Sequence, residues 1–314
     1  MKEQVGICTL SAYVPPERMS LDELAAGFGV NEVFLSKKTG YRKLARKASE
    51  QETSDLAKMA IEPLFHAHPQ LRERLGALIV VTQNPDGYGL PHTSAILHAK
   101  LQLPQSVAAF DIALGCSGWV YGLSVLKSFM EANEIDYGLL VTADPYSKVI
   151  DHTDKNTALL FGDGAAATLL GRDDVRWRIG KFVFGTDGTR WADIRVGEDR
   201  KLKMNGIAVF TFSATKVGEC IKSVVEANGL AVQDIDRVLL HQGSRYIVDT
   251  VGTRLGMAGK TPFVQNDVGN TVSSTIPMML CDPRFNADRR IVACGFGVGL
   301  SWAATVLSNA NQGV

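Results

Sequence analysis

The chain repeats one order of segments in its two halves. In the first half a short apolar run at 76–81, a polar loop and a helical pattern follow one another. The same order returns at 236–257, where an apolar run leads through a polar loop to apolar residues at helical spacing. A Gly-rich turn between apolar runs then closes each half, at 159–171 and at 293–307. A repeat separated by about half the chain is too long for a solenoid and predicts two similar α/β halves.

Several expected strands are apolar on consecutive residues rather than on alternate ones. Such strands are covered on both faces, so helices should lie outside the sheets and between them. A chain of 314 residues exceeds the usual size of a single core. The charged segment 172–178 follows the last expected strand of the first half. We therefore predict an α/β fold with two domains, an N-terminal half at 1–171 and a C-terminal half at 172–314.

Composition excludes several classes of protein. The 33 acidic and 33 basic side chains balance, as in a globular protein rather than one that coats nucleic acid. No apolar run is long enough to span a membrane and the first residues do not form a signal peptide, so we expect a cytoplasmic protein without a membrane segment. The five cysteines are scattered and never stand in metal-ligand spacing. Neither a disulfide framework nor a metal site is expected.

Cys116 differs from the other cysteines in its position. It lies in the segment DIALGCSGWVYGL, between an extended apolar run and apolar residues at helical spacing from Trp119 onward. A thiol at a helix N-terminus faces unpaired N–H groups and the positive end of the helix dipole, so its pKa should fall and its thiolate should be nucleophilic. Gly115 and Gly118 should keep side chains away from the sulfur. The alternative is a buried turn cysteine with a packing role.

Two further residues can join Cys116 at one edge of the fold. His241 ends an apolar run, and Asn270 follows the strand-like piece TPFVQ at the place that Cys116 occupies in the first half. The strand ends of a duplicated fold converge on one edge. Cysteine, histidine and asparagine form a nucleophilic grouping that serves more than one chemistry. Taken singly, the histidine can be structural and the asparagine a turn residue.

The motifs around these residues resemble those of β-ketoacyl-acyl-carrier-protein synthase III enzymes, which are condensing enzymes of the thiolase fold. The matching segments follow the family's order along nearly the whole chain: KKTGYRKLA, AFDIALGCSGWVYGL, LLFGDGAAATLL, HQGSRYI, DVGNTVSST and GFGVGLSW. The resemblance implies a thiolase-like, five-layered αβαβα fold built of two similar halves. It also implies a homodimer and an acyltransferase of fatty acid or polyketide biosynthesis.

A reaction is implied as well. Cys116 would take an acyl group from an acyl-CoA or an acyl carrier as a thioester, with the backbone N–H groups of Cys116 and Val298 binding the oxyanion. His241 and Asn270 would bind the carbonyl of a malonyl thioester, whose decarboxylation drives a Claisen condensation to a 3-oxoacyl product. Coenzyme A thioesters are substrates here, and neither a cofactor nor a metal is expected.

The resemblance assigns further binding residues, with departures from the family pattern. Phe34 replaces a tryptophan that stacks on the adenine of coenzyme A, and Tyr246 replaces an arginine that docks the acyl carrier protein. Either Arg245 substitutes for that arginine, or the acceptor differs. Leu90 replaces an aromatic residue that reaches across the dimer to close the partner's acyl pocket. A longer or branched acyl group should therefore fit.

The segment KKTGYRKLARK at 37–47 carries six basic residues and no acid. It forms either a solvated face or a landing site for an acidic carrier protein or for the phosphates of coenzyme A. Nucleic acid is not expected there, because the segment holds one aromatic residue. We assign Lys38, Arg42 and Arg46 to the landing site.

The sequence leaves three functions to be separated. The first is decarboxylative condensation. The second is an acyltransferase of the same fold that delivers the acyl group to a hydroxyl or amine of a small metabolite in a specialised pathway, which the altered histidine loop would permit. The third is a non-catalytic partner of another synthase, disfavoured because all three reactive residues are present. Carbon dioxide release separates the first from the second, and acylation of Cys116 excludes the third.

Overall fold

A computed structural model describes residues 4–30 and 35–312, in which nine strands form one sheet in the order β11-β12-β13-β8-β1-β7-β6-β4-β5. The strands of the first half are β1 (Gly6–Tyr13), β4 (Leu75–Val81), β5 (Ala108–Ile112), β6 (Tyr137–Ala143) and β7 (Ala165–Gly171). Those of the second half are β8 (Trp177–Thr186), β11 (Arg237–Leu240), β12 (Arg290–Gly297) and β13 (Ser301–Asn309).

The two halves of the sheet repeat one another. In the first half β7 pairs antiparallel with β1 and β6, while β6, β4 and β5 run parallel. In the second half β13 pairs antiparallel with β8 and β12, while β12 and β11 run parallel. The halves meet where Ile7 of β1 pairs with Trp177 of β8. The sheet therefore carries the predicted duplication, and we propose 171/172 as the domain boundary because β7 ends at Gly171.

One expected piece of the second half is not a strand. Residues 261–265, the expected strand-like piece TPFVQ, lie outside the strands, so β5 has no counterpart in the part of the chain that the structure describes. Polar side chains hold this segment instead: Asn266 donates to the carbonyl oxygen of Gly40, and Gln265 donates to that of Thr275. These bonds tie the segment to neighbouring loops rather than to a strand ladder.

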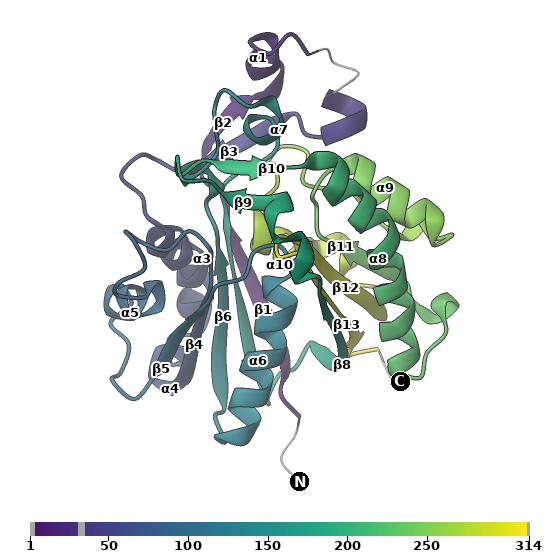
Figure 1. Cartoon of the computed structure of the whole chain (residues 1–314). Helices are drawn as coiled ribbons and strands as arrows, with labels where there is room; N and C mark the ends of the chain where they lie inside the picture. Colours follow the sequence, from purple (N-terminus) through teal and green to yellow (C-terminus); the bar gives the residue numbers. More distant parts are fainter. Residues whose placement is uncertain (1–3, 31–34, 313–314) are drawn as a thin grey trace.

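Six helices form layers around the sheet, namely α3 (Thr53–Ala67), α5 (Thr93–Lys100), α6 (Gly118–Ala132), α8 (Gly206–Ala227), α9 (Arg245–Arg254) and α10 (Thr275–Leu280). α3 and α5 cover the outer face of the first half, and α8 and α9 cover that of the second (Figure 1). α6 and α10 share one buried apolar cluster with strands of both halves. The outer helices of the first half, its half of the sheet, the central α6 and α10, the second half of the sheet and its outer helices make the five predicted layers.

Short elements complete the fold, and β2 pairs with β3 and β9 with β10 in two small antiparallel sheets. The strands are β2 (Glu17–Ser20), β3 (Lys43–Arg46), β9 (Ile194–Val196) and β10 (Leu202–Met204). The helical turns are α1 (Leu21–Ala26), η1 (Leu35–Thr39), α4 (Leu71–Arg74), η2 (Tyr146–Lys148), α7 (Lys155–Ala158), η3 (Gly188–Asp193), η4 (Val232–Asp234), η5 (Ala258–Lys260), η6 (Val272–Ser274) and η7 (Pro283–Phe285). No helix within the described ranges combines the length and the apolar character that a bilayer crossing needs.

Candidate active site

One cavity of about 240 Å³ brings the predicted reactive residues together. Cys116 reaches it from the loop before α6, His241 from the end of β11, and Asn270 from the loop before α10. Val298, in the turn between β12 and β13, also lines it. Most of the remaining lining is apolar, so a ligand in this cavity is largely removed from water.

Close packing surrounds the thiol of Cys116, which is 9% exposed. A Cβ atom at Gly297 would lie 2.8 Å from Sγ, so the end of β12 approaches the sulfur only because this residue is glycine. A Cβ atom at Gly115 would lie 2.5 Å from Oε1 of Gln83, and one at Gly118 would lie 2.4 Å from Val81. Gly115 and Gly118 therefore make room for neighbouring side chains of the same protein, and not for a ligand as predicted. Sequence reasoning assigned no role to Gly297.

The predicted low pKa of Cys116 is wrong. The pKa of this thiol is raised to about 12, first by burial and second by the nearby carboxyl group of Asp144. Hydrogen bonds from the backbone of Val298 and of Cys116 itself act in the opposite direction. The cost of removing a thiolate from water outweighs the favourable helix N-terminus. The resting site thus holds a neutral thiol, with two backbone donors beside its sulfur.

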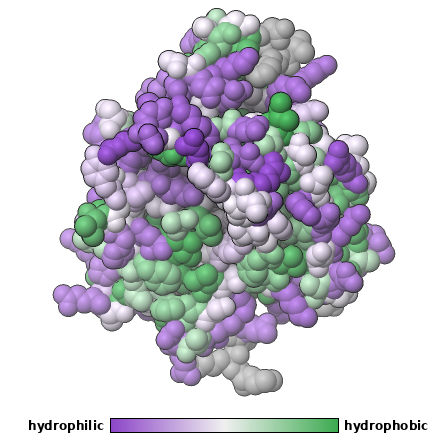
Figure 2. Space-filling view, viewed as in Figure 1, coloured by the Kyte–Doolittle hydropathy of each residue, from purple (hydrophilic) through white to green (hydrophobic). Residues whose placement is uncertain are grey.

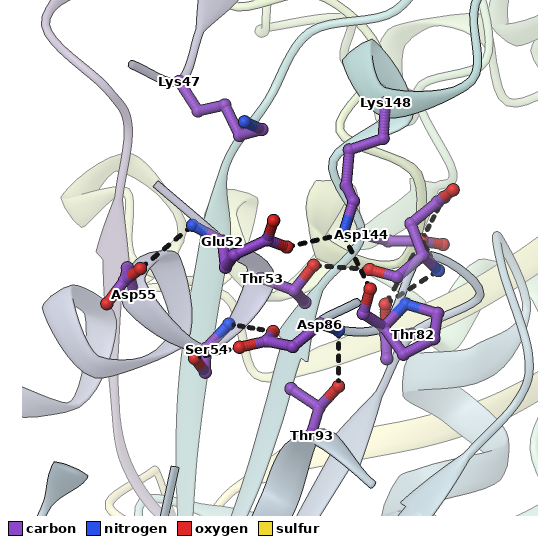
Figure 3. A network of polar contacts seen from close by, with 12 residues as sticks. Lys47, Glu52, Thr53, Ser54, Asp55, Thr82, Asp86, Thr93, Asp144 and Lys148 are labelled. Carbon is purple, nitrogen blue, oxygen red and sulfur yellow. Dashed lines mark hydrogen bonds and ion pairs between the residues drawn. The ribbon is translucent and has the colours of Figure 1, made fainter. Parts of the chain in front are cut away.

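Asp144 is a buried carboxyl group that sequence reasoning missed. Its Oδ1 accepts hydrogen bonds from the side chain of Asn84 at 2.8 Å and from the backbone of Gln83 at 3.1 Å. Its Oδ2 is buried and has no hydrogen-bond partner among the described residues. Burial raises the pKa of Asp144 to about 7. The carboxyl group belongs to the polar network that Figure 3 shows.

The same network holds the loop that follows β4. Lys148 donates to the carbonyl oxygen of Pro85 at 2.6 Å, and the backbone of Ser54 donates to Asp86 at 2.8 Å (Figure 3). The base of the loop is thereby fixed on α3 and on the turn after β6. Leu90, near the tip of this loop, is 94% exposed. It does not line the cavity of its own chain.

His241 and Asn270 are both buried and held by hydrogen bonds. Burial lowers the pKa of His241 to about 3, so its imidazole is neutral near pH 7. Its Nδ1 lies 2.8 Å from Oγ1 of Thr275. Oδ1 of Asn270 accepts a hydrogen bond of 2.9 Å from the backbone of Val272, which leaves Nδ2 of the same amide as the donor for a ligand.

Two exposed lysines, Lys38 and Lys155, line the cavity and give it a positive charge. Among the described residues that line the cavity, Lys38 and Lys155 carry a positive charge, and none is an Asp or a Glu. His241 also lines it but is neutral. Nζ of Lys38 lies 3.9 Å from the ring centroid of Tyr246, and that ring stacks on Phe210 at 4.8 Å. Sequence reasoning missed Lys155, which no motif had singled out.

The structure corrects the assignment of Arg46 to the landing site. Its side chain is buried and donates to the carbonyl oxygen of Phe161 at 2.6 Å. Arg46 lies two residues after the buried Leu44 and therefore on the same face of strand β3, which a count of basic residues does not reveal. Phe34 lies outside the described residues.

Arg42 and Arg245 do not line the cavity. Arg42 is exposed and forms an ion pair of 2.5 Å with Asp267. Arg245 is half-buried, and its guanidinium group lies 4.7 Å from the ring centroid of Phe263. Each cation therefore already has a partner in the fold. Within the described ranges, no three His, Cys, Asp or Glu side chains are grouped to hold a metal ion.

Each half of the chain matches a family model, and the whole chain matches named relatives. The family model described as 3-Oxoacyl-[acyl-carrier-protein (ACP)] synthase III matches residues 110–188, and its C-terminal counterpart matches residues 225–308. The β-ketoacyl-[acyl-carrier-protein] synthase III of Deinococcus deserti is 31% identical over 96% of this chain and 90% of its own length. The enzyme of that name from Lactococcus lactis subsp. cremoris strain SK11 is 32% identical over 94% and 96%.

A solved structure matches almost throughout. That of β-ketoacyl-[acyl-carrier-protein] synthase III from Thermus thermophilus has a TM-score of 0.89 and 32% identity, and the match covers 96% of this chain and 98% of that one. Both halves of the chain are therefore matched in order and in fold. The chain belongs to the 3-oxoacyl-[acyl-carrier-protein] synthase III family.

Proposed function

We propose that this protein is a condensing enzyme that joins an acyl group to a malonyl thioester with loss of carbon dioxide. The observation that carries the proposal is that Cys116, His241 and Asn270 meet in one mostly apolar cavity. The relatives described above are named as synthases of this kind. The acyl donor is an acyl-CoA or an acyl carrier, and the product is a 3-oxoacyl thioester.

The first step is acyl transfer to Cys116. Its sulfur attacks the donor thioester, the bond from the acyl carbon to the donor sulfur breaks, and the proton of the Cys116 thiol ends on the released thiol. The tetrahedral intermediate carries an oxyanion, and the backbone N–H groups of Cys116 and Val298, which lie beside the sulfur, are its proposed donors. Since the resting thiol is neutral, proton loss accompanies attack rather than preceding it.

The second step is decarboxylation of the malonyl thioester. The bond between the carboxylate carbon and C2 breaks, and its electron pair moves onto the thioester carbonyl oxygen as an enolate. His241 and the amide nitrogen of Asn270 are the proposed donors to this oxygen. The apolar lining favours the reaction because it removes the carboxylate from water while its charge spreads into the enolate.

The third step forms the new carbon–carbon bond. C2 of the enolate attacks the acyl carbon on Cys116, and the thiolate leaves and is protonated again. All electrons come from the substrates, and the leaving Cys116 thiolate takes one proton from water, which replaces the proton that Cys116 lost to the released thiol in the first step. We therefore propose that the reaction needs no metal or redox cofactor.

Lys38 and Lys155 fit the phosphates of coenzyme A or of the phosphopantetheine arm of an acyl carrier protein. Both are exposed at the solvent end of the cavity, and the lining within the described residues offers no acid that would repel an anion. Arg42 is a weaker candidate because Asp267 already neutralises it. The five cysteines are free thiols, which suits the reducing cytoplasm.

A second copy of the chain is the proposed partner at the edge strand β5. This strand ends the sheet, and its residues are only half-buried. Figure 2 shows apolar side chains gathered over the lower half of the visible face, where Figure 1 places α6 and β8. Val125 on α6 and Phe184 on β8 are 40% and 44% exposed. In such a homodimer Leu90 would reach the partner's acyl pocket.

The decisive experiment measures the release of carbon dioxide and the formation of the 3-oxoacyl product in the same reaction. The protein is incubated with a panel of acyl-CoAs and with malonyl thioester on coenzyme A or on the carrier protein. We expect carbon dioxide release that matches 3-oxoacyl product by mass spectrometry. Transfer of the acyl group to a small hydroxyl or amine without carbon dioxide release would instead establish the acyltransferase alternative.

A further inference from the structure

The two ring nitrogens of His241 face different surroundings. Nδ1 lies 2.8 Å from Oγ1 of Thr275. Nε2 lies on the side of Gly243, another cavity residue, where an added Cβ atom would be 3.4 Å away. The imidazole is neutral near pH 7 and carries one hydrogen. The nitrogen that holds this hydrogen decides whether His241 donates or accepts in the cavity.

The hydroxyl group of Thr275 has one hydrogen and two possible acceptors. It lies 3.2 Å from the carbonyl oxygen of Val272 and 2.8 Å from Nδ1 of His241, and the backbone of Val272 is also a hydrogen-bond partner of the imidazole, whose pKa it raises against the larger effect of burial. If the hydrogen points to Val272, Nδ1 must carry the ring hydrogen, and Nε2 presents a lone pair to the cavity. If the hydrogen points to Nδ1, the ring hydrogen is on Nε2, and His241 is a donor.

Val272 contacts both Thr275, which faces His241, and Asn270. Its backbone has φ of 55°, a left-handed conformation that is costly for a β-branched residue. In that conformation its N–H donates to Oδ1 of Asn270, and its carbonyl group lies beside Thr275. The backbone of Thr275 is itself held by a 2.8 Å bond from Gln265. One short, buried turn therefore orients both proposed enolate donors.

We propose that Thr275 is a positioning residue that donates its hydroxyl hydrogen to Nδ1 of His241 and so keeps a hydrogen on Nε2. The shorter of the two contacts favours this direction, and Phe296 holds the ring from another side with its edge at 87° to the imidazole. The consequence for turnover rests on the proposed function, because an enolate oxygen needs a donor. The position of the hydrogen is a property of the resting protein.

Three variants separate the hydroxyl group from the shape of the side chain. Thr275→Val removes the hydroxyl at nearly constant volume, and Thr275→Ser keeps it. Thr271→Val is the matched control on the same turn, since the hydroxyl of Thr271 contacts Met278 and neither His241 nor Asn270. We expect the kcat of condensation to fall about ten- to hundred-fold in Thr275→Val and to stay near wild type in the other two.

Acylation of Cys116 should change by no more than about two-fold in all three variants, because backbone N–H groups serve that step. Equal kcat values for wild type and Thr275→Val would overturn the proposal. So would an equal loss in Thr275→Ser, which would assign the effect to packing.

The spectroscopic test needs no substrate. In protein labelled with ¹⁵N-histidine, comparison with His241→Ala identifies the His241 signals. We expect hydrogen on Nε2 in wild type and Thr275→Ser, and on Nδ1 in Thr275→Val. Hydrogen on Nδ1 in the wild type would overturn the proposal even if the valine variant does not fold. Failure to decarboxylate any malonyl thioester would refute the proposed function and leave this result unaffected.

Discussion

The backbone N–H of Val272 donates a hydrogen bond of 2.9 Å to Oδ1 of Asn270 and thereby fixes the direction of its amide. Asn270→Asp keeps the Oδ1 atom that accepts from Val272 but replaces the donor Nδ2 with a carboxylate oxygen. The negative charge of the carboxylate is spread over both oxygens. We expect malonyl decarboxylation to fall by about 10²–10³-fold, because an anion then faces the developing enolate. Carbon dioxide release measures this step.

Acylation of Cys116 should survive in the same variant, and in His241→Ala, because its oxyanion donors are backbone groups. Intact-protein mass spectrometry after rapid quenching measures it. A folded variant that no longer forms the acyl-enzyme would show that the division of roles between the two steps is wrong.

Cys116 should be the only cysteine that substrate acylates. Cys220 and Cys294 are buried in the apolar core, and Cys8 and Cys281 are half-buried elsewhere in the fold. None of these four lines the cavity. Peptide mapping after treatment with acyl-CoA should locate the adduct on Cys116 alone. Enzymatic acylation that persists in Cys116→Ala would contradict this assignment.

The reactivity of Cys116 should depend on the charge of Asp144. Because the thiol pKa is about 12, the thiolate fraction and the alkylation rate by iodoacetamide should rise about ten-fold per pH unit up to pH 9. Asp144 has a pKa of about 7, so it is charged above that pH and then opposes the thiolate. Asp144→Asn should therefore react faster than wild type at pH 8.5 and similarly at pH 6.

Cys116→Ala measures the background from the other thiols in this assay. Equal rates for Asp144→Asn and wild type at pH 8.5 would show that the carboxyl group does not act on the thiol. A rate plateau below pH 8 in wild type would show that the thiol pKa is lower than about 12.

Lys38→Glu should weaken binding of the phosphate-bearing substrates. Lys38 lines the solvent end of the cavity, so a reversed charge there repels phosphate. We expect KM for acyl-CoA to rise several-fold, about 1 kcal/mol, with kcat little changed and with a smaller salt dependence. A neutral N-acetylcysteamine thioester should be unaffected. Lys58→Glu, on the outer helix α3, is the matched charge reversal and should leave KM for both thioesters unchanged. A similar rise of KM in Lys58→Glu would show that Lys38 has no specific role.

Leu90→Phe should shorten the range of acyl groups that the enzyme accepts. Leu90 is 94% exposed on a loop whose base is fixed, so a larger ring changes little within its own chain. In the proposed homodimer the ring would fill part of the partner's pocket. Turnover with long or branched acyl-CoAs should fall relative to acetyl-CoA, at an unchanged dimer mass by light scattering. A monomeric wild-type protein, or an unchanged substrate profile, would contradict this role of the loop.

The sequence by itself determined the duplicated α/β fold and the place of Cys116, His241 and Asn270 at element ends. Apolar runs and helical spacing are local properties of the chain, and a repeat shows directly in the order of segments. The prediction of a strand at 261–265 (TPFVQ) was wrong for the same reason. Its apolar residues resemble a strand, but the side chains of Gln265 and of the next residue, Asn266, bond to other loops.

Only the tertiary structure decided the protonation of the site and the accessibility of the basic segment. A helix N-terminus predicts a low thiol pKa, yet the depth of Cys116 and the nearness of Asp144 raise it. The sequence predicts Arg46 to be a surface cation, yet its side chain is buried and donates a hydrogen bond to the carbonyl oxygen of Phe161. Desolvation and charge interactions depend on what distant segments place around a group, and this packing is a property of the assembled fold.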